Sequence, residues 1–560
     1  MDDITKTQQS FARKALTDPT HRFEDVYHLI CREEWIRFAL SHVLGNKGSR
    51  TPGMDGVTRR TFESETYTTR VIEQLQQQLR TSMYRPNPVK RLYIPKPNGK
   101  KRPLGISTIQ DRVVQMLLKM LMEPIWESDF LDCSSGFRPN RRTMDCIAMC
   151  YRLINDSNKY YWVVEGDITG CFDHVQHDIL LNLISKRIRD SRVLRLIELF
   201  LSAGVMEESF FHQTDEGTPQ GGIASPLWAN IYLHELDRYW WGQYNTFTPH
   251  QRAKRREQAI GNCRLLRYAD DFLILTNGPK AEAERLRGEF QTFLQDTLKL
   301  ELSEDKTLVT HVNAGFDFLG FHIRRYINPK QGSQPVTLVT PSGKSVERLK
   351  AKIRHMTGHE RRLDHPYLKF QAVNQLLRGW MGYYQHVNAK DTVNGLQFWV
   401  NERVLRWLIS HHRCRVGDAL SRYRHEDKGR KNLAVKDAKG QLLYLYILDR
   451  HPITRYVDQK RTNPYLAHWV TELQPTPEQP NLDPQQTWNG EEHFPGWQEA
   501  KMSRLSIDGG CCTRCGATDN LDVHHLHKRR WNERRQGNDD PTHLRTLCER
   551  CHVETFGNAK

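Results

Sequence analysis

Long apolar runs are missing from this 560-residue sequence. No segment approaches the ~18 consecutive apolar residues of a transmembrane helix, so we expect no membrane partner. The first ten residues, MDDITKTQQS, are polar and acidic, which is not typical of a secretory signal or of an Arg-rich transit peptide. The sequence therefore predicts a cytoplasmic protein, of a bacterium or, alternatively, of an organelle.

Acidic residues are fewer than basic ones. Lys and Arg number 82 and Asp and Glu 66, which gives a net charge of +16 and a pI of about 9.2. Residues 341–440 alone hold 21 basic and 9 acidic residues. Such a region favours polyanions, although a solvated basic surface would have the same composition. Aromatic residues are interleaved with the basic ones and favour nucleic-acid binding: Trp380, Tyr383, Tyr384, Trp399 and Trp407.

Cysteines are scarce outside the C-terminal end, which argues against a disulfide framework. Of twelve cysteines, five lie in the last fifty residues, and four of these form two Cys-x-x-Cys pairs: Cys512 with Cys515 and Cys548 with Cys551. This spacing is typical of a closed, structural Zn²⁺ site with four thiolate ligands. Cys511 is out of register and is not expected to be a ligand.

Two segments carry carboxylates next to apolar strands. "RYADDFLIL" (Arg267–Leu275) places two aspartates before an apolar run, and "YYWVVEGD" (Tyr160–Asp167) ends an apolar run in acidic residues. The aspartate pair belongs either to a tight turn facing water or to half of a metal site. If the two strands are antiparallel neighbours, their carboxylates can hold two Mg²⁺ ions about 3.5–4 Å apart, as in-line phosphoryl transfer requires.

These segments fall within an ordered series of motifs that resembles group II intron reverse transcriptases. The series covers residues 46–415 and includes "RLYIPKPNGKKRPLGISTIQDRVVQ", "SSGFRPNR", "GTPQGGIASPLWANIYLHELD", "LELSEDKT", "GFDFLGFHI" and "RGWMGYY". The resemblance implies an α+β fold, namely a right-hand polymerase with fingers, an antiparallel palm sheet and an α-helical thumb.

The same resemblance implies roles for individual residues. Asp167 and Asp270 would be the principal Mg²⁺ ligands, with Asp271 completing the acidic cluster. Four other positions match nucleotide-contacting residues: Lys96 and Arg102 at the triphosphate, Phe172 as the steric gate against a ribose 2′-OH, and Gln220 beside the template. Lys306 would protonate the leaving pyrophosphate.

The cysteine-rich end resembles an HNH endonuclease, a ββα-metal module. His525 would be the general base, and His524 and His552 would hold one Mg²⁺ at the scissile phosphate. His543 stands where the motif usually has Asn. The alternative is a zinc ribbon that only binds DNA.

The expected domains follow from these motifs. They are fingers and palm (1–325), thumb or maturase domain (326–415), a basic DNA-binding region (416–475), a linker rich in Pro and Gln (476–503) and the zinc-containing HNH module (504–560). The expected function combines reverse transcription, maturation of a group II intron RNA and nicking of target DNA, with dNTPs as substrates. The alternatives are a splicing maturase without polymerase activity and a reverse transcriptase recruited to host defence.

Local patterns also predict individual elements. Helices are expected at Arg112–Trp126 and Ile179–Leu201. Strands are expected at Tyr161–Val164, Phe272–Leu275 and Leu442–Leu448.

Overall fold

The computed structural model describes residues 3–95, 99, 101–155, 158–207, 210–212, 216–218, 221–327, 335–437, 439–454, 456, 463–466, 504, 508, 511–515, 517, 521–525 and 544–548. The chain divides into two compact units, Met1–Thr471 and Glu472–Lys560. Within the residues described, no helix combines the length and the apolar character needed to cross a bilayer.

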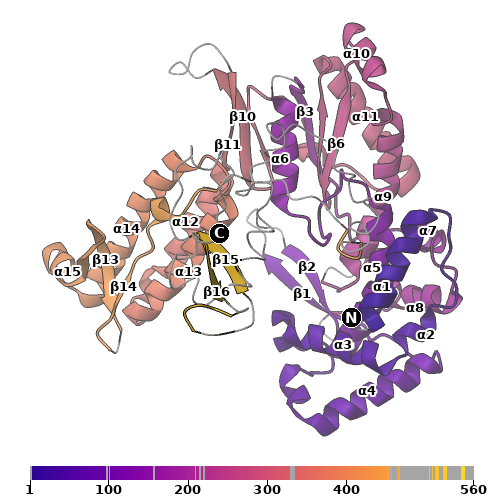
Figure 1. Cartoon of the computed structure of the whole chain (residues 1–560), viewed down its shortest axis with the longest axis horizontal. Coiled ribbons are helices and arrows are strands. Elements are labelled where there is room, and N and C mark those ends of the chain that lie inside the picture. Colours follow the sequence, from indigo (N-terminus) through magenta and orange to yellow (C-terminus); the bar gives the residue numbers. More distant parts are fainter. Residues whose placement is uncertain are drawn as a thin grey trace. The chain divides into compact units, whose positions relative to one another are not determined.

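The first unit is rich in helices (Figure 1). Its α-helices are α1 (Asp3–Thr17), α2 (Tyr27–Ile30), α3 (Glu33–Gly45), α4 (Glu65–Arg80), α5 (Ile109–Asp129), α6 (Thr143–Ile154), α7 (His177–Ser185), α8 (Ser191–Leu201), α9 (Ser225–Tyr244), α10 (Pro249–Glu257), α11 (Lys280–Leu298), α12 (Gly343–Met356), α13 (Pro366–Tyr384), α14 (Lys390–His412) and α15 (Val416–Tyr423).

The strands within the described residues form five small sheets. Their bounds are β1 (Val89–Pro95), β2 (Lys101–Ile106), β3 (Trp162–Asp167), β4 (Val205–Glu207), β5 (Phe210–His212), β6 (Cys263–Tyr268), β7 (Asp271–Thr276), β8 (Leu308–His311), β9 (Phe316–Phe318), β10 (Phe321–Ile327), β11 (Pro335–Pro341), β12 (Arg424–Asp427), β13 (Arg430–Lys436), β14 (Leu442–Tyr444), β15 (Leu521–His525) and β16 (Leu544–Cys548).

Helix α5 runs through the core of the N-terminal part. The structure buries 15 of its 21 residues, because a helix that is apolar on nearly every side must be surrounded by protein. Thr108 caps its N-terminus by accepting a hydrogen bond from the Asp111 backbone N–H. Helices α1 and α3 pack against it. The helix predicted at Arg112–Trp126 is confirmed.

The central sheet has the strand order β6-β7-β3-β8, and all its pairings are antiparallel. Strand β7 is covered on both faces. Phe272 and Ile274 belong to the core that includes α9 and α11, whereas Leu273 and Leu275 belong to the core that includes α6 and β10. Alternate side chains of a strand point to opposite faces, so burial of both faces explains the unbroken apolar run. The strand predicted at Phe272–Leu275 is confirmed within one residue at each end, and the strand predicted at Tyr161–Val164 is confirmed but begins at Trp162 and continues to Asp167.

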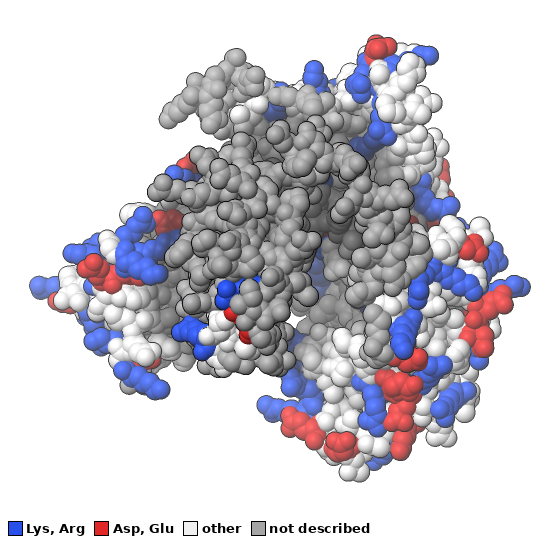
Figure 2. Space-filling model, in the orientation of Figure 1, with Lys and Arg blue, Asp and Glu red and all other residues white. Residues whose placement is uncertain are grey.

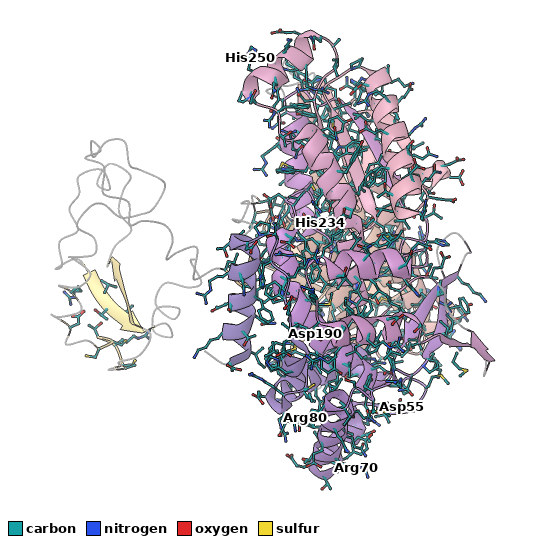
Figure 3. The ribbon with its side chains drawn as sticks, turned by 90° about the vertical axis from the view of Figure 1, so that its right-hand side faces the viewer. Asp55, Arg70, Arg80, Asp190, His234 and His250 are labelled. Atoms are coloured by element: carbon teal, nitrogen blue, oxygen red, sulfur yellow. The ribbon has the colours of Figure 1, made fainter. Side chains whose placement is uncertain are left out.

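The helix predicted at Ile179–Leu201 is wrong as a single element. The segment between α7 and α8 pairs instead with Phe23, whose N–H donates to the Arg187 carbonyl at 2.7 Å and whose carbonyl accepts from Arg189 at 2.9 Å. Asp190 (Figure 3) then caps α8 by accepting from the Arg192 N–H, and it also accepts from the Tyr27 N–H at 2.9 Å. A long-range backbone pairing therefore interrupts a locally helical pattern.

Helices α12, α13 and α14 enclose a separate core that includes Ile353, Phe370, Leu377 and Val400. Strands β12, β13 and β14 form a small sheet whose apolar side chains join this core. The strand predicted at Leu442–Leu448 ends at Tyr444, because the chain turns into a short 3₁₀ helix at Leu448–Arg450. Figure 2 shows basic side chains along the outer edge formed by α15 and β13, with fewer acidic ones between them.

The described residues of 451–466, which we name the return segment, contact earlier parts of the unit. The Tyr456 hydroxyl donates to Asp145 of α6 at 2.6 Å. Farther along, Asn463 donates to Ser128 and Tyr465 donates to Glu123, both on α5. Because these partners lie more than 300 residues earlier, the return segment joins the two ends of the unit.

The described residues of the second unit centre on one hairpin. Strands β15 and β16 are antiparallel, with Leu521 opposite Cys548 and His525 opposite Leu544. Val523, Leu547 and Cys512 are buried. The Cys512 N–H donates to the Ala517 carbonyl at 2.8 Å, which closes a tight loop around the first cysteine pair.

Candidate active site

Two aspartates lie opposite each other where β3 ends and β7 begins. The register pairs Asp167 with Asp271. Asp270 belongs to the two-residue turn between β6 and β7, and its carbonyl accepts a 3.4 Å backbone bond from Ile168. The prediction that two carboxylate-bearing strands are antiparallel neighbours is confirmed.

Gly166 allows these strands to approach. A Cβ atom at this position would lie 2.5 Å from Cζ of Phe272, well inside van der Waals contact. The absent side chain therefore lets the Phe272 ring lie across β3 directly beside Asp167.

Arg267 stabilises the turn that carries Asp270. Ala269 has a left-handed backbone with φ of 58°, a conformation that is unfavourable for a residue with a side chain. Arg267 donates through Nη1 to the Ala269 carbonyl at 2.9 Å. It also forms two bonds to Asp237 of α9, and both side chains are completely buried. Helix α9 thus fixes the turn through one guanidinium group.

Asn230 and Gly136 extend this support. The Asn230 side chain accepts from Arg267 at 3.1 Å and donates to the Gly136 carbonyl at 2.7 Å. A Cβ on Gly136 would lie 2.2 Å from the Ala269 backbone nitrogen, so only glycine fits there. None of these residues was predicted to support the turn. The position of Arg267 next to an apolar strand could have indicated a buried acidic partner, because a buried charge requires a counter-charge.

Burial, together with the charges of neighbouring carboxylates, raises the pKa values of Asp270 and Asp271. Asp271 is exposed as a whole residue, but the packing around its carboxylate disfavours the charge. This desolvation, reinforced by the charges of Asp270 and Asp167, raises the pKa of Asp271 to about 7. Burial also raises the pKa of Asp270, while Arg102 and Lys306 act in the opposite direction. The site therefore concentrates negative charge that a cation would stabilise.

Two predicted cations act on this cluster. Lys306 donates from Nζ to Oδ2 of Asp167, and this bond raises the pKa of the lysine. The charge of Arg102 on β2 opposes the rise in the pKa values of Asp270 and Asp271, which burial dominates. The structure thus brings together five of the predicted polymerase residues.

The cluster fits Mg²⁺ in its donor chemistry. Carboxylate oxygens are the ligands this hard cation prefers. Burial and neighbouring carboxylates raise the pKa values of Asp270 and Asp271, and a bound cation would favour their charged forms. Among the residues described, no group of three or more His, Cys, Asp or Glu side chains is arranged to hold a metal ion. At Asp167, the Lys306 ammonium group lies against the carboxylate. The residues present therefore supply the oxygen donors, and a bound cation would compete with Lys306.

Phe172 lies near the site in a loop after β3. Its carbonyl accepts from the Thr218 N–H at 2.7 Å, and its half-buried ring meets the ring of Phe137 edge-on at 6.1 Å. Phe137 is 51% exposed and has a φ of 58°. The two rings therefore form an apolar contact in the loop that follows β3.

Several predicted residues lie outside the described part of the chain. They are Lys96, Gln220, His543, Cys551 and His552. For His524, His525 and Cys548 the structure gives the backbone, in β15 and β16, and not the side chains. Cys512 is buried and Cys515 is exposed.

Family models match two segments of the chain. Residues 94–323 match "Reverse transcriptase (RNA-dependent DNA polymerase)", and residues 346–424 match "Group II intron, maturase-specific domain". The first segment contains the aspartate cluster, and the second contains α12, α13, α14 and α15.

Similar proteins come from bacteria and from yeast. Protein YkfC of Escherichia coli is 37% identical over 362 residues, which is 61% of this chain and 93% of that protein. The group II intron-encoded protein LtrA of Lactococcus lactis is 35% identical over 54% of this chain and 57% of its own length. The putative COX1/OXI3 intron 2 protein of Saccharomyces cerevisiae is 27% identical over 52% of this chain and 38% of its own length. The chain thus spans about half or less of the last two proteins.

Proposed function

Because the chain belongs to the group II intron family of reverse transcriptases and maturases, we propose that it copies RNA into DNA at the aspartate cluster and binds its intron RNA as a splicing maturase. The pairing of Asp167 with Asp271 beside the Asp270 turn carries the polymerase assignment. The maturase assignment follows from the segment at residues 346–424 and from the basic charge of this part of the chain.

Asp167, Asp270 and Asp271 would hold the Mg²⁺ ions. When bound, these ions activate the primer 3′-hydroxyl and neutralise charge on the leaving pyrophosphate. Arg102 binds the triphosphate of the incoming dNTP through its guanidinium group, which suits phosphate oxygens. Lys306, released from Asp167, donates a proton to the pyrophosphate. Phe172 excludes a ribose 2′-hydroxyl by steric contact.

Primer extension on an RNA template tests the polymerase. Asp270→Asn keeps the shape of the side chain and removes its charge, so we expect extension with dNTPs and Mg²⁺ to fall by at least about a hundredfold. Asp296→Asn on α11, an exposed position, is the matched control and should extend normally. Equal activity of the two variants would contradict the assignment. The Asp270→Asn variant should still promote splicing of the intron RNA. A splicing assay on this variant therefore separates the maturase function from the polymerase.

A second activity, DNA nicking, is proposed for the second unit. The β15–β16 hairpin supports it, because it places the backbone of His524 and His525 on the strand paired with Leu544–Cys548. His525 would activate water and His524 and His552 would hold one Mg²⁺, while the four cysteines would hold a structural Zn²⁺. The nicked strand would then prime copying of the intron at its DNA target.

Nicking of duplex DNA by the purified protein tests this activity. His525→Ala should abolish nicking and leave primer extension intact, whereas unchanged nicking would show that the base is assigned wrongly. Zinc content measured on the same protein should be one ion per chain and should fall in a Cys512→Ser variant.

A further inference from the structure

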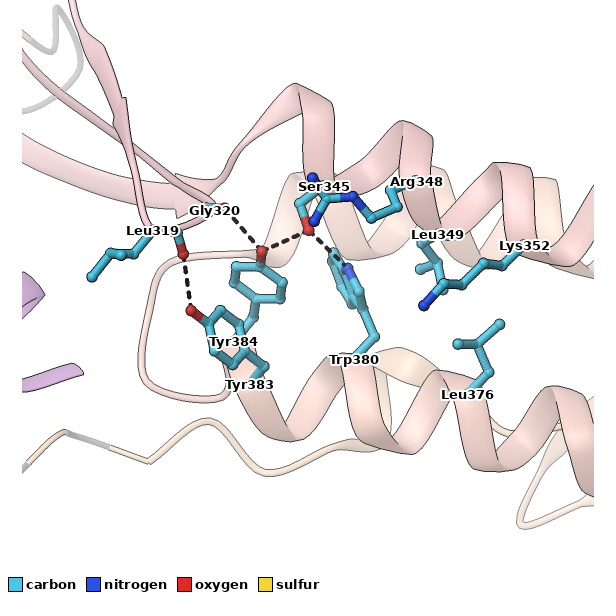
Figure 4. Close-up of a pocket in the computed structure, with 10 residues that line it drawn as sticks. All are labelled: Leu319, Gly320, Ser345, Arg348, Leu349, Lys352, Leu376, Trp380, Tyr383 and Tyr384. Atoms are coloured by element: carbon cyan, nitrogen blue, oxygen red, sulfur yellow. Dashed lines mark hydrogen bonds between the residues drawn. The ribbon is translucent and has the colours of Figure 1, made fainter. Parts of the chain in front are cut away.

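A cavity of about 280 Å³ lies between the β9–β10 turn and helices α12 and α13 (Figure 4). One wall is aromatic and comes from α13, with Trp380, Tyr383 and Tyr384. The opposite wall comes from α12 and carries two basic residues, Arg348 and Lys352. No acidic side chain is among its described lining residues.

The aromatic wall is rigid because its polar atoms already have partners. The Tyr383 hydroxyl donates to the Leu319 carbonyl at 2.9 Å, and the Tyr384 hydroxyl donates to the Gly320 carbonyl at 2.8 Å. The indole N–H of Trp380 donates to the Ser345 hydroxyl at 3.4 Å. The Tyr383 ring stacks on Phe321 and stays 38% exposed. The wall therefore offers ring surface to a ligand without first breaking a hydrogen bond.

The two basic residues differ from the others on the same helix. Lys350 and Arg354 both pair with Glu347 and lie over the Trp399 ring. Arg348 and Lys352 are four residues apart, so they lie on one face of α12. Both are exposed, and neither forms an ion pair within the described residues. Two neighbouring positive charges without a counter-charge, at the mouth of a cavity, favour an anionic ligand.

We propose that this cavity binds one unstacked nucleotide of a single-stranded RNA segment. Its phosphate contacts Arg348 and Lys352, and its base lies against the exposed ring of Tyr383. A duplex cannot present a base face in this way, whereas single strands regularly stack on aromatic side chains. The inference rests on the proposed function, which makes RNA the partner, and adds a defined subsite to it.

RNA affinity of the full chain tests the basic wall. The probe is a fluorescein-labelled oligouridine, without added Mg²⁺ or dNTPs, and the readout is fluorescence anisotropy. Arg348→Ala/Lys352→Ala should weaken binding by about tenfold and make affinity less dependent on salt, because phosphate contacts release counterions. The matched control, Lys350→Ala/Arg354→Ala, removes the same charge from the same helix and should stay within about twofold of the wild type. Equal weakening of both variants would overturn the subsite.

Two tyrosine variants test the aromatic wall. Tyr383→Phe loses the bond to Leu319 and keeps the ring, so its RNA affinity should remain close to that of the wild type. Tyr383→Leu loses the ring and should bind about tenfold more weakly, the loss typical of one base stack. Equal affinities of the two variants would overturn the stacking role, and thermal unfolding of each variant shows whether the fold is retained.

Photocrosslinking identifies the occupant. A 5-iodouridine oligonucleotide should crosslink to the peptide that contains Tyr383, and the crosslink should disappear in the Arg348→Ala/Lys352→Ala variant. A DNA oligonucleotide of matched sequence should crosslink less well, and equal or stronger DNA crosslinking would overturn the choice of RNA. These assays use no polymerisation, so failure of primer extension would not affect them, and their failure would leave primer extension intact.

Discussion

Arg267 and Asp237 form an ion pair that is completely buried, with 2.5 Å between Nη2 and Oδ2. The guanidinium group that neutralises Asp237 also donates to the carbonyl of Ala269, directly before Asp270 of the aspartate cluster. The pair therefore couples the stability of the unit to the shape of the active-site turn.

Breaking this pair should be costly. Arg267→Met leaves Asp237 buried and unpaired, so the free energy of unfolding in urea should fall by about 3–5 kcal/mol. Arg267→Met/Asp237→Leu should recover most of the stability, but primer extension should stay low because the Ala269 carbonyl has lost its donor. Arg37→Met, which breaks the exposed pair with Glu33, should cost about 0–1 kcal/mol. Full activity of the stable double variant would show that Arg267 does not position the turn.

Lys306 should control the Mg²⁺ requirement. Its ammonium group occupies an oxygen of Asp167, so Lys306→Met should lower the Mg²⁺ concentration for half-maximal primer extension. The maximal rate should also fall, because the variant cannot protonate the pyrophosphate. Lys280→Met, an exposed substitution on α11, should change neither value. A Mg²⁺ titration at saturating dNTP separates the two effects, and an unchanged half-maximal concentration would contradict the competition.

Gly166 should tolerate no side chain. In Gly166→Ala the new methyl group meets the Phe272 ring, and we expect a loss of about 1–3 kcal/mol in unfolding free energy together with reduced extension. Gly379→Ala in α13 faces open space and should instead stabilise the unit by about 0.5–1 kcal/mol. Urea unfolding of both variants provides the comparison. If Gly166→Ala left the free energy of unfolding unchanged, β3 and β7 would be able to move apart without a loss of stability.

His234 should make the first unit sensitive to acid. This residue of α9 (Figure 3) is buried, and burial, assisted by Arg267 and Arg238, lowers its pKa to about 4. The folded state therefore favours the neutral ring. Its contribution to stability is complete above the unfolded pKa of about 6.5 and is lost as the pH falls towards 4, by roughly 3 kcal/mol.

His234→Phe removes this titration. The difference in unfolding free energy between wild type and variant should change between pH 7 and pH 4, with the wild type losing more. His250→Phe, at an exposed position on α10, should follow the wild type. Parallel pH profiles for wild type and His234→Phe would show that this ring does not titrate on unfolding.

The sequence is sufficient to predict structural features that depend on local residue patterns and on the order of motifs. The apolar runs of β3 and β7, each next to carboxylates, were sufficient to predict two strands, and the resemblance to group II intron reverse transcriptases implied that they pair in an antiparallel sheet. The contacts that shape the turn could not be predicted, because Arg267 meets Asp237 and Asn230 only after α9 has packed below the sheet. The break between α7 and α8 likewise depends on Phe23, more than 160 residues earlier in the chain.

Burial also separates residues that look alike in the sequence. Tyr383 and Tyr384 are adjacent and aromatic, but Tyr384 is 2% exposed and packs in the core, whereas Tyr383 is 38% exposed. Helical spacing alone cannot show which of two neighbouring rings faces solvent. The sequence predicts only that the aromatic residues of this region favour nucleic-acid binding. The exposure of Tyr383 identifies one ring that a base can contact.

The return segment limits how far the first unit can be truncated at its C-terminal end. The matched maturase segment ends at residue 424, but Leu445 and Leu448 still fill the core around α13, and Leu466 is buried beyond the Tyr465–Glu123 bond. A fragment that stops at residue 424 would expose that core and leave Asp145, Glu123 and Ser128 without these partners. The shortest fragment of the first unit that folds on its own should therefore extend at least through Leu466.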